Sequence, residues 1–269
     1  MIKIGAWEIA ADGTYTFPDG TLSIKLHPIF AEANKTIMVS WFYENDAELF
    51  TLICVRRHYQ QYGMDLYMPY CPHARMDRVK NDEDVFTLKY FCEVINSLNF
   101  NHVYIVDAHS NVAPALLDRV VNLSPEDDIR DVRKILSEKL NDIDICMFYP
   151  DEGAMKRYSD MIKMPYAYGQ KKRRWEDGEI LGLDIIHPEL VKGKNVLIVD
   201  DICSKGGTFY HAAKALKEAG AANIYLFISH CEKTIFEGKI FSSGLIDHVY
   251  TTRSIFKPEW QTDKITILE

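Results

Sequence analysis

The sequence lacks the paired cysteines of a disulfide framework or a zinc site. Its six cysteines are scattered through 269 residues, and none forms a Cys-x-x-Cys motif. This pattern excludes the common structural zinc sites and indicates the reduced, mostly buried thiols of a cytoplasmic protein. The six are Cys54, Cys71, Cys92, Cys146, Cys203 and Cys231.

Positive charge and long apolar segments are also scarce. The chain carries 31 Lys and Arg against 39 Asp and Glu, a net charge of −8. No stretch approaches the roughly 20 apolar residues of a membrane span. The N-terminal MIKIGAWEIAADG lacks the basic start and apolar core of a secretion signal. We therefore expect a cytoplasmic protein that binds neither nucleic acid nor membrane, and that recognises anionic small molecules through local groups.

Segments typical of strands alternate with segments typical of helices over most of the chain. Apolar runs such as 36–42 and 102–109 fit strands, whereas 86–98 and 208–220 fit helices. This alternation predicts an α/β fold with mainly parallel sheets.

The chain divides into two halves at a polar stretch. Residues 122–131, NLSPEDDIRD, contain a proline and an acidic run. We predict an N-terminal lobe at 1–122 and a C-terminal lobe at 123–269. In both halves charged residues follow predicted strands, where open sheets bind their ligands.

One segment of the second half, VLIVDDICSKGGTF, joins a predicted buried strand to a glycine loop and a helix. Gly206 and Gly207 allow a close approach of the backbone to a ligand. The start of the helix adds N–H donors and the positive end of the helix dipole, and Ser204 and Thr208 can add hydroxyl donors. The loop therefore predicts a phosphate site.

The same segment carries two adjacent acids, Asp200 and Asp201, just before the loop. Carboxylates would repel a phosphate at contact distance, but they suit the vicinal hydroxyls of a sugar or a Mg²⁺ ion. Together the acids and the loop predict a site for ribose 5-phosphate. A simple turn with an acid pair that caps the helix is the structural alternative.

This segment resembles the phosphoribosyl pyrophosphate motif of the type I phosphoribosyltransferase fold. Further segments resemble the ribose-phosphate pyrophosphokinases (phosphoribosyl pyrophosphate synthetases), in the order in which that family carries them. They are FPDGTLSIKL, ENDAELFTL, YMPYCPHARMDR, VDAHSN, YPDEGAMKR and KKRR. The resemblance implies two tandem phosphoribosyltransferase-like lobes, with the N-terminal lobe shortened and a tail that can return to it.

The resemblance also implies an activity. Enzymes of this family transfer the β,γ-diphosphoryl group of ATP, with Mg²⁺, to the anomeric hydroxyl of ribose 5-phosphate and release AMP. Such a transfer depends on positioning and charge neutralisation more than on covalent catalysis. A homo-oligomer is implied as well, because in the family the FPDG loop serves the site of the neighbouring subunit.

Residue roles follow from the same resemblance. Forked arginine donors suit the oxygens of a triphosphate, an aromatic ring can stack on adenine, and Mg²⁺ prefers oxygen ligands. The implied nucleotide-binding residues are Phe17, Asp19, Arg75, Asp77, Arg78 and His109. The implied metal ligands, direct or through water, are Asp107, His109 and Asp151. The ribose-phosphate site comprises Asp151, Asp200, Asp201, Ser204, Lys205, Gly206, Gly207 and Thr208. Lys172, Arg174 and His109 are the implied catalytic residues.

Residues 170–179, QKKRRWEDGE, concentrate four cations in a predicted flexible loop. The family places a lysine here and an arginine two residues further on, where they neutralise the diphosphoryl transition state. Lys172 with Arg174 fits this spacing, and Lys171 with Arg173 fits it equally. Both frames stay open, and a solvated run of charge is the structural alternative.

The chain also departs from the family pattern. The family's first strand and helix are largely absent from the residues before FPDG, and the family's last helix is absent after ITILE. Thr21 and Met76 stand where the family has a glutamate and a glutamine near the base, which leaves the preference for ATP open. Ser204 and Lys205 replace an acid and a threonine. This change makes the loop more cationic and leaves ADP-ribose as an alternative acceptor.

Two other classes remain as alternatives. A non-catalytic regulatory homologue would tend to lack His109 or the cationic loop, and both are present. A phosphoribosyltransferase would not need ARMDR, FPDG and VDAH. A dinucleotide-binding oxidoreductase is excluded, because no Gly-x-Gly-x-x-Gly follows a strand.

Overall fold

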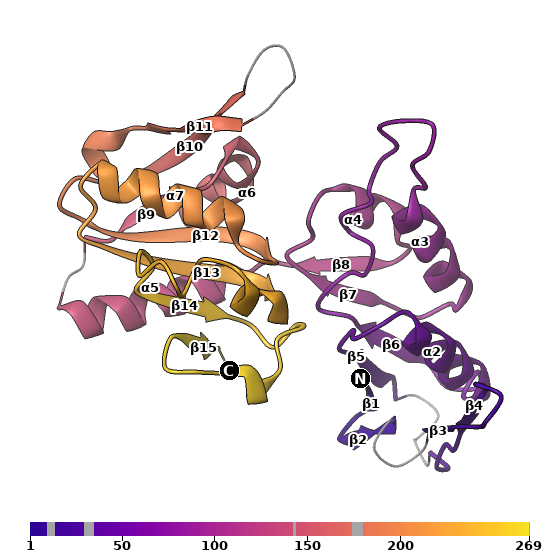
Figure 1. The fold of residues 1–269 in the computed structure, drawn as a ribbon. Helices are drawn as coiled ribbons and strands as arrows, with labels where there is room; N and C mark the ends of the chain where they lie inside the picture. Colours follow the sequence, from indigo (N-terminus) through magenta and orange to yellow (C-terminus); the bar gives the residue numbers. More distant parts are fainter. Residues whose placement is uncertain (10–13, 30–34, 142–143, 174–179, 269) are drawn as a thin grey trace. The chain divides into compact units, whose positions relative to one another are not determined.

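The computed structural model describes residues 1–9, 14–29, 35–141, 144–173 and 180–268. The chain forms two compact units, Met1–Ser124 and Pro125–Glu269 (Figure 1). The lobe boundary predicted after Asn122 lies within strand β8 (Val120–Leu123), two residues before this division. Each unit is described here by itself.

The N-terminal unit is built on a sheet with the strand order β2-β1-β5-β6-β7-β8. Strands β5 to β8 run parallel, and β1 is antiparallel to both β5 and β2. The strands are β1 (Ile2–Ile4), β2 (Trp7–Glu8), β5 (Ile37–Trp41), β6 (Met64–Tyr67), β7 (Val103–Val106) and β8. Its helices are α2 (Ala47–His58), α3 (Thr87–Ser97) and α4 (Val112–Leu116). A separate hairpin joins β3 (Thr14–Thr16) to β4 (Leu22–Ile24).

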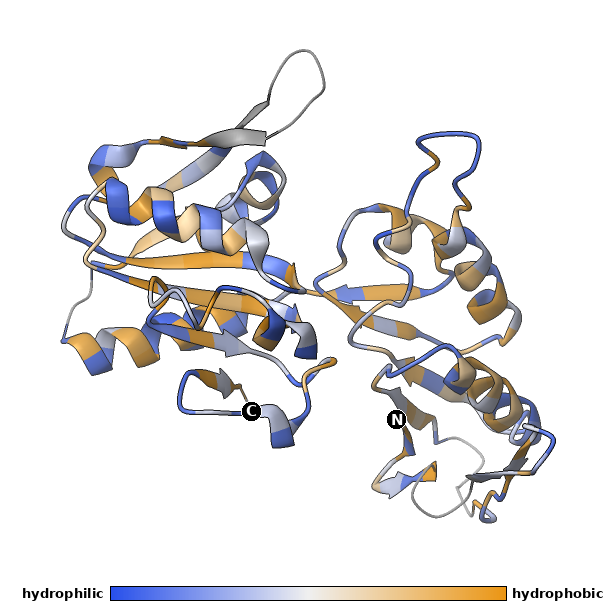
Figure 2. Ribbon diagram, in the orientation of Figure 1, coloured by the Kyte–Doolittle hydropathy of each residue, from blue (hydrophilic) through white to orange (hydrophobic). Residues whose placement is uncertain are grey.

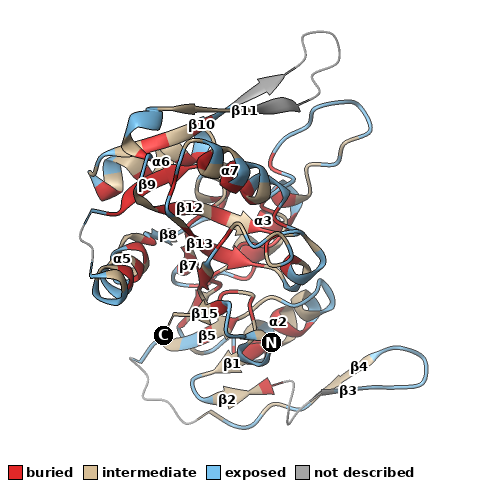
Figure 3. Cartoon of the chain, turned by 60° about the vertical axis from the view of Figure 1, so that its left-hand side comes forward, coloured by how far each residue is buried: buried red, intermediate tan, exposed pale blue. Residues whose placement is uncertain are grey.

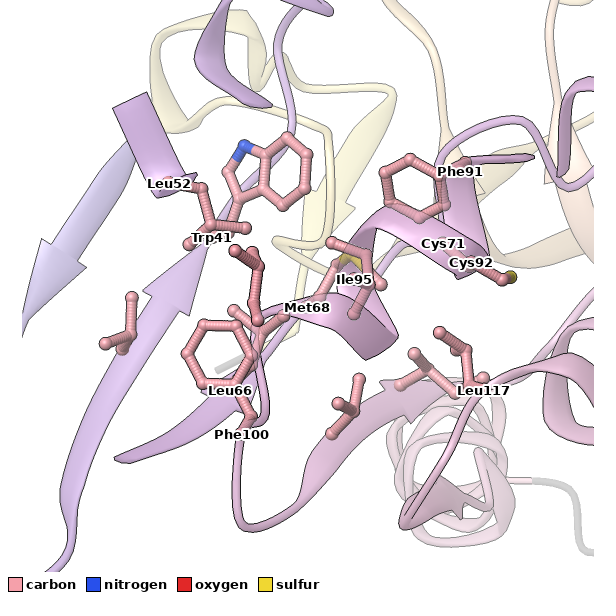
Figure 4. Packing of buried hydrophobic residues seen from close by; sticks show 14 of the residues in the cluster. Trp41, Leu52, Leu66, Met68, Cys71, Phe91, Cys92, Ile95, Phe100 and Leu117 are labelled. Carbon is pink, nitrogen blue, oxygen red and sulfur yellow. The ribbon is translucent and has the colours of Figure 1, made fainter. Parts of the chain in front are cut away.

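Burial alternates along the strands of this unit. Leu66 in β6 and Ile105 in β7 are fully buried, whereas their neighbours in each strand are half-buried. One face of the sheet therefore carries the core, as the period of two requires. Figure 4 shows Trp41, Leu66 and Phe100 packing with the residues of α3 in this core. The indole N–H of Trp41 donates to Glu48 of α2 over 2.9 Å, which satisfies the polar atom that its burial encloses.

The C-terminal unit is built on a sheet with the strand order β11-β10-β9-β12-β13-β14-β15. All neighbours are parallel except β10 and β11. The strands are β9 (Cys146–Tyr149), β10 (Tyr166–Arg173), β11 (Ile180–Ile186), β12 (Asn195–Cys203), β13 (Asn223–Cys231), β14 (His248–Thr251) and β15 (Ile265–Ile267). Its helices are α5 (Glu126–Leu140), α6 (Glu152–Ile162) and α7 (Gly207–Glu218).

Both faces of this second sheet are buried. In β12, Val196 and Ile198 pack into one core with α7, and Leu197 and Val199 pack into another with α5 and α6. A strand covered on both faces needs a continuous apolar run, which is what VLIV supplies. β12 and β13 are accordingly the most continuously hydrophobic strands in Figure 2, and buried residues dominate both in Figure 3.

The predicted α/β fold with two mainly parallel sheets is confirmed. The sequence reasoning named no strand at the positions of β1, β2, β3, β8, β11, β14 or β15. It also expected KKRR to form a loop, whereas Lys171, Lys172 and Arg173 continue strand β10. Pairing with β11 explains this difference, because a charged edge hairpin satisfies its backbone without an apolar pattern. No helix in the described ranges is long and apolar enough to cross a bilayer.

Because both faces of the second sheet are buried, the same substitution should have different effects on stability at two positions of the C-terminal unit. Ile198 in β12 is fully buried, so Ile198→Ala is expected to lower the free energy of unfolding by about 2–5 kcal/mol. Ile135 on α5 is 39% exposed, and Ile135→Ala should lower the same free energy by about 1 kcal/mol or less. Urea unfolding followed by circular dichroism measures both values. Equal losses would contradict the described packing.

Candidate active site

The candidate site of the C-terminal unit lies where the order of its parallel strands reverses. Strand β9 pairs with β10 on one side and with β12 on the other. The connection from β9 leads through α6 to β10, and β12 leads through α7 to β13. Ligands of open α/β sheets bind outside the carboxyl ends of two strands related in this way. Asp151 follows β9 at this point, and Asp200 and Asp201 lie near the end of β12.

Asp200 and Asp201 differ in their electrostatic surroundings. Burial, followed by the adjacent charge of Asp201, raises the pKa of Asp200 well above its usual range, and Asp151 adds to this effect. Asp201 is buried, but its Oδ2 lies 3.0 Å from Nη1 of Arg157 on α6. Asp201 therefore has a cation beside it.

Arg157 is a site residue that the sequence reasoning missed. It lies six residues after Asp151, within the YPDEGAMKR segment, and its guanidinium carbon lies 5.6 Å from the centroid of the Tyr158 ring. The segment gave a weak signal, because Ala154 and Arg157, three residues apart, lie on one side of α6. The sequence alone did not show that this side faces the end of β12.

Asp151 is the N-cap of α6. Its Oδ1 accepts hydrogen bonds from the backbone N–H groups of Gly153 at 3.0 Å and Ala154 at 3.1 Å. These bonds satisfy two of the free donors at the start of the helix and fix the carboxylate at the sheet edge. The structure therefore brings Asp151, Asp200, Asp201 and Arg157 together within one unit.

The predicted phosphate loop is the connection between β12 and α7. Gly206 has φ +73°, a conformation that favours glycine, and a Cβ there would overlap the side chain of Ile240. Gly207 begins α7, and both Gly207 and Thr208 are exposed. The first backbone N–H groups of a helix have no acceptor within it, so they are available to an anion at this exposed end.

The side chains of the loop have partners that the sequence did not reveal. The ammonium of Lys205 lies 3.0 Å from Oε2 of Glu237, and Ser204 Oγ lies 3.0 Å from Thr234 Oγ1. Glu237 offsets part of the positive charge that Lys205 brings to the loop. The additional cationic character expected from Ser204 and Lys205 is therefore smaller than the sequence indicates.

In the N-terminal unit, Asp77 and Arg78 of the ARMDR segment form a two-point ion pair. Arg78 Nε and Nη2 donate to the two carboxylate oxygens of Asp77 over 2.6 and 2.9 Å. These bonds, with smaller contributions from Ser110 and His109, lower the pKa of Asp77 to about 2 against the opposing effect of its burial. The structure thus places Asp77, Arg78 and His109 near one another. Arg75 is exposed in the same loop.

Asp107 and His109 follow strand β7. Asp107 is buried and adopts φ +43°, which is uncommon for a residue with a side chain but better tolerated by Asp than by most. Its backbone N–H donates to Leu123, and that of Ala108 donates to the side chain of Asn122. This segment is therefore held by strand β8.

Phe17 and Asp19 lie in the turn between β3 and β4. The Phe17 N–H donates to Thr21, the Gly20 N–H donates back to Phe17, and Gly20 has φ +86°. Thr21 donates twice to Asp19, and these bonds hold the pKa of Asp19 below its ordinary value. The ring of Phe17 stays substantially exposed beside Tyr15, with 4.8 Å between ring centroids. The predicted FPDG turn with an available aromatic ring is present.

The remaining predicted residues stay untested by geometry. Arg174 lies outside the described residues, and for Lys172 only the backbone in β10 is described. Of the predicted metal ligands, Asp107 and His109 belong to one unit and Asp151 to the other. Within the described ranges no cluster of three or more His, Cys, Asp or Glu side chains could hold a metal ion.

Comparison with known proteins finds relatives of this chain. The phosphoribosyl transferase domain model matches residues 153–249. A ribose-phosphate pyrophosphokinase of Thermococcus kodakarensis is 30% identical over 241 residues, which cover 87% of this chain and 79% of that protein. The protein of the same name from Pyrococcus furiosus is 28% identical over 94% of this chain and 88% of its own length.

A solved structure shares the fold. The phosphoribosylpyrophosphate synthetase from Mycobacterium smegmatis matches with a TM-score of 0.71 at 18% identity, over 95% of this chain and 84% of that one. Because the Thermococcus relative is 30% identical to this chain and aligns over 79% of its own length, the chain belongs to the ribose-phosphate pyrophosphokinase family of enzymes.

Proposed function

We propose that the chain transfers the β,γ-diphosphoryl group of ATP to the anomeric hydroxyl of ribose 5-phosphate, giving phosphoribosyl pyrophosphate and AMP. The observation that carries this proposal is the junction of β12 and α7. The buried Asp201 and the half-buried Asp200 lie there beside a glycine loop and an exposed helix start. The names of the relatives support the same substrate.

The acceptor binds, on this proposal, across that junction. Asp200 and Asp201 accept hydrogen bonds from the ribose hydroxyls, and the backbone N–H groups at the start of α7 hold the 5-phosphate. Arg157 Nη1 lies 3.0 Å from Asp201 Oδ2 and orients this carboxylate. This arrangement fixes the sugar at both ends, so that its anomeric oxygen has one orientation toward the nucleotide.

The nucleotide binds to residues of the N-terminal unit. Arg75 and Arg78 suit triphosphate oxygens, and Asp77 orients Arg78 through the two-point pair. The exposed ring of Phe17 offers a stacking face for the base, and a turn so exposed supports sharing between subunits of a homo-oligomer.

The family resemblance assigns Mg²⁺ to Asp107, His109 and Asp151, and the two carboxylates among them are ligands of the kind that Mg²⁺ prefers. When bound, the ion supplies neutralisation of the charge on the transferring phosphoryl oxygens.

ADP-ribose is the second candidate acceptor. The Lys205–Glu237 pair is exposed on both sides, and exposed ion pairs contribute little stability, so Lys205 can leave Glu237 for a second phosphate. Ribose 5-phosphate remains the principal proposal, because Glu237 already offsets the charge that made a larger anion attractive.

One incubation tests the function. The protein is mixed with MgATP and either ribose 5-phosphate or ADP-ribose, and the nucleotide released is identified by chromatography. Release of AMP with consumption of ribose 5-phosphate is the expected result. Release of ADP would indicate an ordinary kinase and would overturn the proposal, and consumption of ADP-ribose alone would replace the acceptor.

The cationic segment in β10 should act on turnover rather than on binding. Lys172→Ala is expected to lower kcat by about 10²–10³, because the ammonium stabilises charge that develops during transfer. The KM for ribose 5-phosphate should change little. Lys171→Ala is the matched control: a large loss there, with near-normal turnover in Lys172→Ala, would select the other frame.

The unequal aspartates should respond in opposite ways to loss of charge. Because the pKa of Asp200 is raised in the folded state, its ionisation removes stability as pH rises from about 4 through the folded value. Asp200→Asn should therefore raise the thermal midpoint by roughly 2–4 °C at pH 8 and by less at pH 4.5. It should also weaken ribose 5-phosphate binding.

Asp201→Asn provides the contrast, since it removes the carboxylate that Arg157 pairs with. We expect it to lower the thermal midpoint at pH 8. Thermal unfolding without ligand and calorimetric titration with ribose 5-phosphate measure both variants. Stabilisation by Asp201→Asn would show that the assignment of the two environments is wrong.

A further inference from the structure

A second segment forms the outer wall of the phosphate loop. This outer segment, residues 232–240, follows β13 and contains the 3₁₀ turn Lys233–Glu237. The backbone N–H of Glu232 donates to Cys203 over 2.8 Å. A Cβ on Gly238 would overlap the carbonyl oxygen of Lys205, so the two backbones touch there. The outer segment thus contacts the end of β12 through Glu232 and the loop through Gly238.

A chain of hydrogen bonds connects the two segments. Ser204 Oγ and Thr234 Oγ1 are 3.0 Å apart, and Thr234 Oγ1 donates to Oε2 of Glu232 over 3.1 Å. A hydroxyl has one proton, and an ionised carboxylate can only accept. Since Thr234 gives its proton to Glu232, Ser204 must be the donor to Thr234.

This direction has a consequence for the phosphate site. The proton of Ser204 is committed to Thr234, so Ser204 presents lone pairs, and not a donor, to an anion in the loop. Ser204 can donate to a phosphate only if one bond of the chain is given up. The loss of one such bond corresponds to about a 2- to 10-fold change in a dissociation constant.

We propose that Glu232, acting through Thr234, withholds the Ser204 proton from the bound phosphate and thereby weakens the hold of the loop on the 5-phosphate. Glu232 and Thr234 are positioning residues in this arrangement. The inference rests on the proposed function, because it takes the loop as the site of the 5-phosphate. Substrate and product carry the same 5-phosphate, so a weaker hold also favours release of the product.

A double-mutant cycle tests the chain. Glu232→Met has a similar length and removes the acceptor, so Thr234 can donate to Ser204, and Ser204 to the phosphate. Its dissociation constant for ribose 5-phosphate should fall about 3- to 10-fold, with a matching fall in KM and no rise in kcat. Thr234→Val also frees Ser204 and should tighten binding. The double variant should bind no more tightly than Thr234→Val alone.

Two further variants separate the hydrogen-bond chain from a simple effect of charge. In a Ser204→Ala background, Glu232→Met should not tighten binding, because no proton remains to be released. In a Thr234→Ser background the hydroxyl is kept, and the tightening should return. Equal tightening by Glu232→Met in every background would overturn the inference and indicate loss of a repelling charge. Thermal unfolding of each variant controls for folding.

The titration also distinguishes the two levels of proposal. If the wild-type protein does not bind ribose 5-phosphate, the proposed function fails and the inference fails with it. If the wild type binds but Glu232→Met leaves the dissociation constant unchanged, only the inference is overturned.

Discussion

The site depends on placing two adjacent carboxylates at the end of a strand that is buried on both faces. Burying a carboxylate is unfavourable unless a cation or hydrogen bonds compensate it. Asp201 has Arg157 at 3.0 Å, whereas Asp200 accepts the backbone N–H of Asp201 and faces a second negative charge. The pair is therefore held in place by the sheet around it, and β12 lies between β9 and β13. A ligand with hydroxyl donors would compensate the remaining negative charge of these two carboxylates by hydrogen bonds.

Features written in a short stretch of sequence could be predicted. The glycines of the phosphate loop, the FPDG turn and the continuous apolar run of β12 follow from local rules on backbone conformation and burial. Gly206 at φ +73° and the hydrogen-bonded turn at Phe17 have the conformations that their residues favour. The fold class follows from the same alternation repeated along both halves.

Partners brought together only by the tertiary fold could not be predicted. Thr234 and Glu237 lie about thirty residues from the loop side chains that they contact, and nothing in their own neighbourhood marks them. Arg157 required knowledge of which side of α6 faces β12. The strand at Lys171–Arg173 required knowledge of its pairing with β11. In each case the missing information was a contact between segments, and local propensity does not contain it.

The pairing of charges around the loop also indicates how an anion is recognised. Lys205 is offset by Glu237, Arg157 is committed to Asp201, and Ser204 donates to a chain that ends on Glu232. Little surplus positive charge is left among these side chains, and the whole chain is negative. On the proposed function, attraction of the 5-phosphate therefore falls to the directed N–H groups at the start of α7, which require correct placement of the ligand. On the proposed function, the site would therefore select the 5-phosphate by its geometry, since a misplaced anion would meet carboxylates on either side.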